Sequence, residues 1–144
     1  MLVADTASRI TYVLDEPARI LVVDDDPIIL EFARVYLTTP VADIQTAGGG
    51  ASALEALVSE RFDLALVDLE MPGMSGFELI QRIRSVPRLA SLPIIVVTGR
   101  EDVESIDEAF RAGATSFVTK PINWRLLSYQ MRYVLRAHAG EHAA

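Results

Sequence analysis

Carboxylates, one hydroxyl and one ammonium group follow apolar runs that lie far apart in this sequence. The acids are Asp24, Asp25 and Asp68, the hydroxyl belongs to Thr98 and the ammonium to Lys120. Carboxylates that lie close together repel one another, and a hard cation such as Mg²⁺ relieves that repulsion. Lysine adds a compact positive charge that suits a phosphoryl oxygen, and Lys120 is the only lysine in the chain. Together these residue types predict Mg²⁺-dependent chemistry on a phosphoryl group.

The elements that must bring these residues together are five apolar runs with the character of buried strands. They cover residues 19–23, 41–46, 64–67, 92–97 and 116–119. Segments with a helical spacing of apolar residues alternate with them, at residues 27–37, 53–58, 77–83, 102–112 and 123–139. The alternation predicts an α/β fold, a doubly wound five-stranded parallel sheet with five helices. Because the carboxyl ends of parallel strands share one edge, we expect the polar residues to meet there.

Each polar residue also has an ordinary structural interpretation. Aspartates often cap helices, and Asp26 followed by Pro27 is typical of a helix start. Thr98 is a β-branched residue at the end of a strand run, and Lys120 before Pro121 suits an exposed turn. We favour a shared site because the polar residues follow several different strand runs, which the ordinary interpretations do not explain together.

Composition narrows the class of protein. The 144 residues suit one domain with a single core, and a hydrophobic content of 51% argues against disorder. No apolar run approaches the roughly 18 residues of a membrane span, and the N-terminus lacks the basic start of a secretory signal. We therefore expect a cytoplasmic protein that does not enter a membrane. A formal charge of -7 disfavours direct binding of nucleic acid, and the lack of cysteine excludes disulfides and thiolate metal sites.

Several short segments resemble the receiver domain of two-component response regulators, the family that includes the chemotaxis regulators. The segments are VVDDDP at 22–27, VDLEMPGMSG at 67–76, VVTG at 96–99 and FVTKP at 117–121. The resemblance covers about residues 19–139 and implies the flavodoxin-like strand order 2-1-3-4-5. It leaves residues 1–18 as an N-terminal extension and residues 140–144 as a tail.

The resemblance implies a role for each residue of the site. Asp68 would accept a phosphoryl group, as an acyl phosphate, from a sensor histidine kinase or a phosphotransfer protein. Asp24 and Asp25 would be the acid pair for Mg²⁺, with Asp25, Asp68 and the backbone carbonyl of Glu70 as direct ligands. Lys120 would contact the phosphoryl group. The domain would then be a self-catalysing phosphoacceptor in signalling and not an enzyme.

The same resemblance implies the residues of a switch. Thr98 would bond to the phosphoryl group, and Phe117, at the aromatic switch position, would turn inward unless it is simply a buried strand residue. The surface of the fourth and fifth strands and helices would change as a result. Glu70 and Arg100 occupy positions that influence hydrolysis of the phosphoryl group, and we expect them to pair across the mouth of the site. The peptide bond before Pro121 would be cis.

Two other functions remain open at this point. Asp24 and Asp26 form an Asp-x-Asp pair after a buried strand, as in Mg²⁺-dependent phosphatases of the haloacid dehalogenase type, although Ile28 departs from that pattern. A degenerate receiver that only binds partners is the second alternative, and the complete set of acids, threonine and lysine argues against it. A flavodoxin-type FMN site is disfavoured because three aspartates after the first strand would repel the phosphate.

The sequence leaves open which output domain or partner such a receiver controls. No DNA-binding or catalytic domain follows, so we expect either a stand-alone receiver or the front of a longer regulator. The last helix is similar to that of receivers that precede domains for cyclic-di-GMP synthesis or hydrolysis. Arginines and tyrosines are mixed along it, and this mixture suits a partner surface such as a symmetric homodimer. These residues are Arg125, Tyr129, Arg132 and Tyr133.

Overall fold

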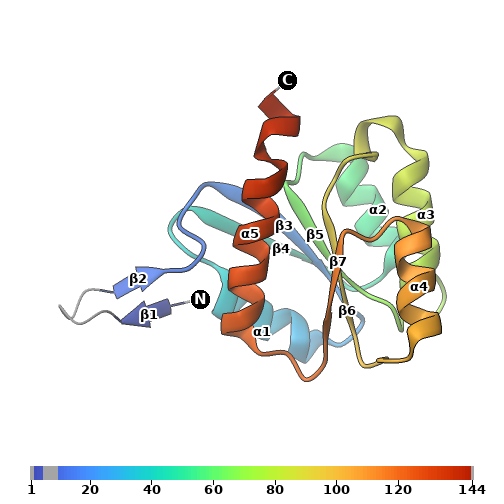
Figure 1. Cartoon of the computed structure of the whole chain (residues 1–144), viewed down its shortest axis with the longest axis horizontal. Coiled ribbons are helices and arrows are strands. Elements are labelled where there is room, and N and C mark those ends of the chain that lie inside the picture. The colour runs from blue at the N-terminus through green and yellow to red at the C-terminus, as the bar shows by residue number, and fades with distance from the viewer. Residues whose placement is uncertain (1, 5–9, 144) are drawn as a thin grey trace.

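The computed structural model describes residues 2–4 and 10–143, and its main body is a five-stranded parallel sheet between two layers of helices (Figure 1). The strands stand in the order β4-β3-β5-β6-β7, which is 2-1-3-4-5 when they are counted along the chain within this sheet. The predicted fold is therefore confirmed. The strands are β3 (Ala18–Val23), β4 (Ala42–Ala47), β5 (Leu64–Asp68), β6 (Ile94–Thr98) and β7 (Ser116–Thr119).

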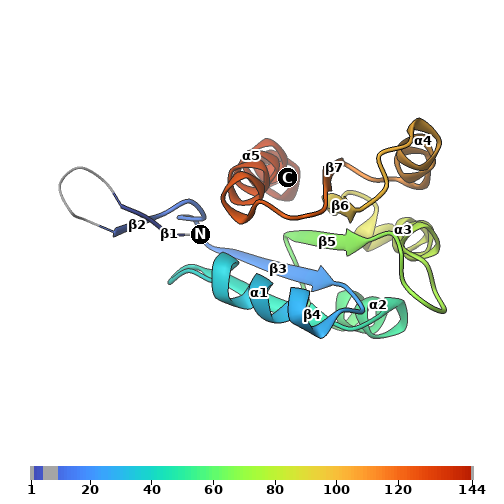
Figure 2. The ribbon, with the colours of Figure 1, turned by 90° about the horizontal axis from the view of Figure 1, so that it is seen from below.

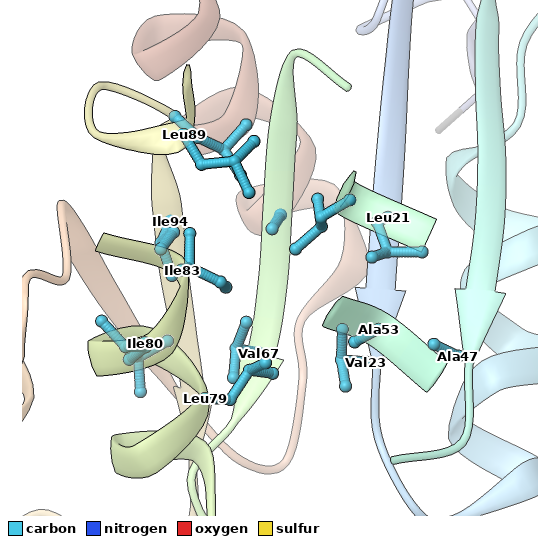
Figure 3. Packing of buried hydrophobic residues seen from close by; sticks show 14 of the residues in the cluster. Leu21, Val23, Ala47, Ala53, Val67, Leu79, Ile80, Ile83, Leu89 and Ile94 are labelled. Atoms are coloured by element: carbon cyan, nitrogen blue, oxygen red, sulfur yellow. The ribbon is translucent and has the colours of Figure 1, made fainter. Parts of the chain in front are cut away.

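Two hydrophobic clusters cover the two faces of the sheet, because successive residues of a strand point to opposite faces. Leu21 and Val23 of β3 pack with α2 (Gly50–Ser59), α3 (Gly76–Ser85) and α4 (Val103–Ala112), and Figure 3 shows part of this cluster. Ile20 and Val22 pack on the other face with α1 (Pro27–Leu37) and α5 (Trp124–Ala143). In Figure 2, α1 and α5 accordingly lie on one side of the strands and α2, α3 and α4 on the other.

Capping residues set where the helices begin and end. Asp26 accepts a hydrogen bond from the backbone N–H of Ile28 at the start of α1, as predicted. Ser75 and Asp102 cap α3 and α4 in the same way. Gly113 ends α4 with a φ of 123°, a conformation that favours glycine. The three capped helix starts each follow a strand of the sheet, so they lie on the side of its carboxyl edge.

Some boundaries differ from the sequence prediction. α2 begins at Gly50, which the prediction assigned to a loop. Glycine suits this position because a Cβ would approach the sulfur of Met74 to 2.6 Å. β6 begins at Ile94, since Leu92 still belongs to the turn before it. α5 continues beyond its predicted end at residue 139. Neither α5 nor any other helix in the described part of the chain is long and apolar enough to cross a membrane.

Two short strands near the N-terminus pair with each other, and a connection leads from the second strand to the main sheet. β1 (Leu2–Ala4) and β2 (Ile10–Tyr12) pair antiparallel in a separate two-stranded sheet beside the main body (Figure 1). Leu14 is 2% exposed and belongs to the cluster of α1 and α5. Its carbonyl oxygen accepts a hydrogen bond of 2.7 Å from the hydroxyl of Thr39. Leu14 therefore packs on the main body, whereas the domain boundary at residue 18 stays a prediction.

Candidate functional site

The carboxyl edge of the sheet carries the polar residues selected from the sequence. Asp24 follows β3 directly and donates its backbone N–H to the carbonyl oxygen of Ala47 at 3.2 Å. Asp68 is the last residue of β5 and lies opposite Val97 of β6. Thr98 is the last residue of β6. Asp24, Asp68 and Thr98 are all at most 3% exposed, because the strands that carry them are buried on both faces.

Three carboxylates and one ammonium group lie close together at this edge. Asp24, Asp25 and Asp68 each offer a carboxylate oxygen within 4.8 Å of the others. The Nζ of Lys120 lies 3.1 Å from Oδ2 of Asp24 and 3.5 Å from Oδ2 of Asp68. The backbone N–H of Glu70 donates to Oδ1 of Asp68 at 3.2 Å. The structure thus brings together residues that are up to 96 positions apart in the chain.

The environment of Asp68 disfavours its charged form. Burial, and then the neighbouring carboxylate of Asp24, raise its pKa from 3.8 to about 6, although the Glu70 N–H and the Lys120 ammonium act in the opposite direction. For Lys120, burial acts to lower the pKa, but the carboxylates of Asp24 and Asp68 outweigh this effect and raise it. Lys120 therefore stays protonated, and its positive charge only partly offsets the effects of burial and of Asp24 on Asp68.

This donor set fits a hard divalent cation such as Mg²⁺. Its ligand atoms are oxygens, and three carboxylates face a single ammonium group, so the cluster has excess negative charge for a cation to neutralise. Asp24 and Asp68 are buried while Asp25 is exposed, which leaves one side open to solvent. The role of the Glu70 backbone carbonyl as a further ligand stays a prediction.

The loop after β5 depends on glycine for its shape. Gly76 donates its backbone N–H to the carbonyl oxygen of Leu69 at 3.0 Å. A Cβ at Gly76 would clash with the carbonyl oxygen of Asp68 and would lie 2.6 Å from the Cα of Leu69. Gly73 has a φ of 76°, in the left-handed region. These two glycines let α3 begin directly behind the aspartate.

Thr98 and Arg100 are hydrogen-bonded to each other within the loop after β6. The backbone N–H of Arg100 donates to Oγ1 of Thr98 at 2.9 Å. The Arg100 side chain forms the expected ion pair with Glu70, with 2.7 Å between Nε and Oε1, and both side chains are more than half exposed. Its Nη1 also donates to Oγ of Ser105 at 3.2 Å. Ser105 was not among the residues expected from the sequence, because its contact with Arg100 depends on side-chain conformation.

Phe117 lies on β7 with its ring partly buried against the cluster of α2, α3 and α4. Its ring meets that of Phe110 edge to face, with centroids 6.2 Å apart. The side chain of Gln130 on α5 donates to the carbonyl oxygen of Phe117 at 3.3 Å. No sequence pattern predicted this contact. The Lys120–Pro121 peptide bond is cis, as predicted. Movement of Phe117 as a switch stays a prediction.

Comparisons with known proteins agree with this fold. A family profile described as the response regulator receiver domain matches residues 20–132. The heme response regulator HssR of Staphylococcus aureus (strain JH9) is 37% identical over 118 residues, which are 82% of this chain and 51% of that protein. The chain therefore spans about half the length of the curated relatives it matches.

Solved structures of receivers superpose on this fold. The chemotaxis protein CheY4 of Vibrio cholerae is 30% identical with a TM-score of 0.78, over 82% of this chain and 98% of that one. A CheY-like receiver domain protein of Methanospirillum hungatei is 30% identical with a TM-score of 0.81, over 88% and 99% of the two chains. The receiver domain of an HD domain-containing protein of Pseudomonas fluorescens is 26% identical with a TM-score of 0.80, over 87% and 99%.

Proposed function

The chain belongs to the response regulator receiver family, and from this premise we propose that Asp68 takes up a phosphoryl group from a phosphorylated histidine of a partner protein. It is a receiver domain of two-component signalling, and neither the phosphatase nor the degenerate-receiver alternative is favoured. The observation that carries the proposal is the position of Asp68, buried at a strand end with the Lys120 ammonium 3.5 Å away and two further aspartates beside it.

The transfer joins a carboxylate oxygen of Asp68 to phosphorus and breaks the P–N bond of the phosphohistidine. The bonding electrons stay on the imidazole nitrogen, which takes up a proton from solvent. Above its pKa of about 6, Asp68 is already a carboxylate and needs no general base. Lys120 offsets negative charge on the phosphoryl oxygens as the two anions approach. Asp24, Asp25 and Asp68, with the Glu70 carbonyl, would hold Mg²⁺, which would supply further neutralisation of the negative charge.

The phosphorylated aspartate then changes the hydrogen bonds around it. The new group carries additional negative charge and strong acceptor oxygens. The Thr98 hydroxyl donates to one of these oxygens, and the loop after β6 moves with it. Phe117 turns into the space that this movement vacates, so the surface of β6, α4, β7 and α5 changes. This surface is the output of the switch.

The ion pair of Glu70 and Arg100 controls the lifetime of the phosphorylated state. It spans the mouth of the site between the loops after β5 and β6, where it restricts the approach of water to the acyl phosphate. Removing both side chains should change the rate of dephosphorylation, and an unchanged rate would refute this role.

Acetyl phosphate with Mg²⁺ tests the proposed acceptor. We expect the wild-type chain to gain one phosphoryl group, measured by intact mass, and the Asp68→Asn variant to gain none. The Asp63→Asn variant is the matched control, since Asp63 directly precedes the opposite end of the same strand, and it should label normally. Labelling that survives Asp68→Asn but requires Asp24 would instead identify a phosphatase-type nucleophile. Removal of Mg²⁺ with EDTA should abolish labelling.

The partners of the domain are further parts of the proposal. A sensor histidine kinase or a phosphotransfer protein supplies the phosphoryl group. A C-terminal output domain that makes or hydrolyses cyclic di-GMP, and a homodimer formed through α5, stay predictions. Since the chain spans half of its curated relatives, the sequence of the whole gene is the observation that identifies the output.

A further inference from the structure

Arg100 forms hydrogen bonds with three parts of the molecule: the end of β6, the loop after β5 and the start of α4. Its backbone N–H donates to Oγ1 of Thr98 at 2.9 Å, at the end of β6. Its Nε donates to Oε1 of Glu70 at 2.7 Å, in the loop after β5. Its Nη1 donates to Oγ of Ser105 at 3.2 Å, in the first turn of α4. The two loops of the site and the start of α4 are therefore linked through a single side chain.

Ser105 is a fixed anchor for this link. It is 4% exposed, and its backbone N–H donates to Oδ2 of the cap residue Asp102 at 2.9 Å. A buried hydroxyl on a capped helix start has little freedom to follow the Arg100 side chain. If Arg100 moves, it therefore leaves Ser105 or displaces the first turn of α4.

The contacts of Arg100 oppose the change that phosphorylation requires. Thr98 must present its hydroxyl to the phosphoryl group, and the loop that carries Arg100 must move with it. In the proposed switch, that movement would break the charge-assisted hydrogen bonds of Arg100 to Glu70 and to Ser105. The unphosphorylated arrangement is stabilised by both contacts, while the phosphorylated arrangement has to form without them.

Resting on the proposed function, we propose that Arg100 and Ser105 form a latch that holds the loop after β6 and the start of α4 in the unphosphorylated arrangement. Ser105 acts as a positioning residue, through Arg100, and touches neither the metal site nor the phosphoryl group. The latch sets the equilibrium between the two arrangements. This role is separate from that of the Glu70 pair at the mouth of the site, which concerns access of water.

The latch is tested with beryllofluoride, a stable mimic of the phosphoryl group, in the presence of Mg²⁺. Ser105→Ala and Arg100→Ala should each raise the affinity for beryllofluoride by about threefold to tenfold, because less stabilisation is lost on switching. The double variant should bind no more tightly than Arg100→Ala alone, since both changes break the same link. Ser105→Thr keeps the hydroxyl and should bind like the wild type. Hydrogen exchange at residues 103–106 should rise in Ser105→Ala.

Ser128→Ala is the matched control, because Ser128 is also a buried helical serine but lies on α5 and donates to the carbonyl oxygen of Trp124. An affinity of Ser105→Ala equal to that of the wild type, or additive effects in the double variant, would overturn the latch. Failure of the wild-type chain to bind beryllofluoride would instead overturn the proposed function. If Ser105→Ala does not fold, Arg100→Ala is compared with Glu70→Gln, which keeps the contact of Arg100 with Ser105. Arg100→Ala should then bind beryllofluoride more tightly than Glu70→Gln, and equal affinities would overturn the latch.

Discussion

The buried position of Asp68 disfavours the charged form of its carboxyl group. Its pKa is raised to about 6, chiefly by burial, whereas an unfolded chain ionises near 3.8. Below about pH 4 the carboxyl group is protonated in the folded and the unfolded protein, and it does not lower the free energy of unfolding. As the pH rises through about 6, the folded protein resists ionisation that the unfolded chain accepts freely, so folding stability is lost. The reactive residue is therefore a local weakness of the metal-free fold.

We predict that Asp68→Asn stabilises the metal-free protein at pH 7.5 by about 2 kcal/mol. The amide keeps the shape of the carboxyl group and removes the charge that burial disfavours. Thermal or urea unfolding in EDTA measures the difference, which should shrink at pH 4. Glu55→Gln is the control, since Glu55 is an exposed acid on α2 and should change little. A variant less stable than the wild type at pH 7.5 would contradict this account.

The identity of the site residues was accessible from sequence, but their hydrogen bonds were not. Asp24, Asp68 and Lys120 follow apolar runs, and the topology of a parallel sheet is enough to bring them to one edge. The contacts of Ser105 and Gln130 depend on the side-chain conformations of residues on other elements. A pattern in one segment carries no information about those conformations.

Arg84 holds three elements together near the amino-terminal end of the sheet. Its Nε and Nη2 donate to the carbonyl oxygen of Gly113 at 3.0 and 2.7 Å, and its Nη1 donates to that of Leu89 at 3.0 Å. The side chain thus joins α3 to η1 (Pro87–Leu89) and to the end of α4. Burial lowers the pKa of Arg84, and the carbonyl oxygens satisfy its donors.

We predict that Arg84→Lys lowers the free energy of unfolding by about 1–3 kcal/mol, because an ammonium group cannot reproduce the planar fork that reaches two carbonyls. Urea unfolding measures the change. Arg82→Lys is the matched control on the same helix, since Arg82 is exposed and pairs with Glu78 across one turn. Equal effects of the two substitutions would show that the fork contributes nothing.

Strand and helix types followed from periodicity, while some boundaries did not. β5 and β6 were predicted from apolar runs because both faces of a central parallel strand are buried. The start of α2 was missed since consecutive glycines favour a loop, and the close approach of Met74 that requires Gly50 comes from another segment. The prediction followed the preference of consecutive glycines for a loop, whereas packing against Met74 accommodates Gly50 in the helix.

Residues 14–16, which precede the first strand of the main sheet, contact the side of the molecule that carries α1 and α5. Leu14 fills this face together with residues of α1, β3 and α5. Arg136 on α5 pairs with Asp15 at 3.6 Å and Glu16 at 2.8 Å, contacts that are exposed and contribute little by themselves. The sequence prediction placed residues 1–18 in an N-terminal extension, and no pattern in that segment shows its contact with α5, because Arg136 lies 120 residues from Glu16.

We predict that Leu14→Ala lowers the free energy of unfolding by about 2–4 kcal/mol, as expected for a buried leucine whose cavity is not refilled. Val41→Ala, at a residue that is 41% exposed, should cost much less. Chemical unfolding of the two variants provides the measurement. A cost for Leu14→Ala as small as that for Val41→Ala would mean that residues before β3 are dispensable for stability.

The presence of a single lysine has a practical consequence. Reagents that acylate primary amines have two kinds of target on this chain, the α-amino group and the Nζ beside Asp24 and Asp68. Coupling to a sensor surface through amines would therefore inactivate the molecules that attach through Lys120, and binding assays would underestimate the active fraction. Because the sequence has no cysteine, one cysteine introduced at exposed Glu55 offers a unique thiol for immobilisation or dye labelling that leaves the ammonium group intact.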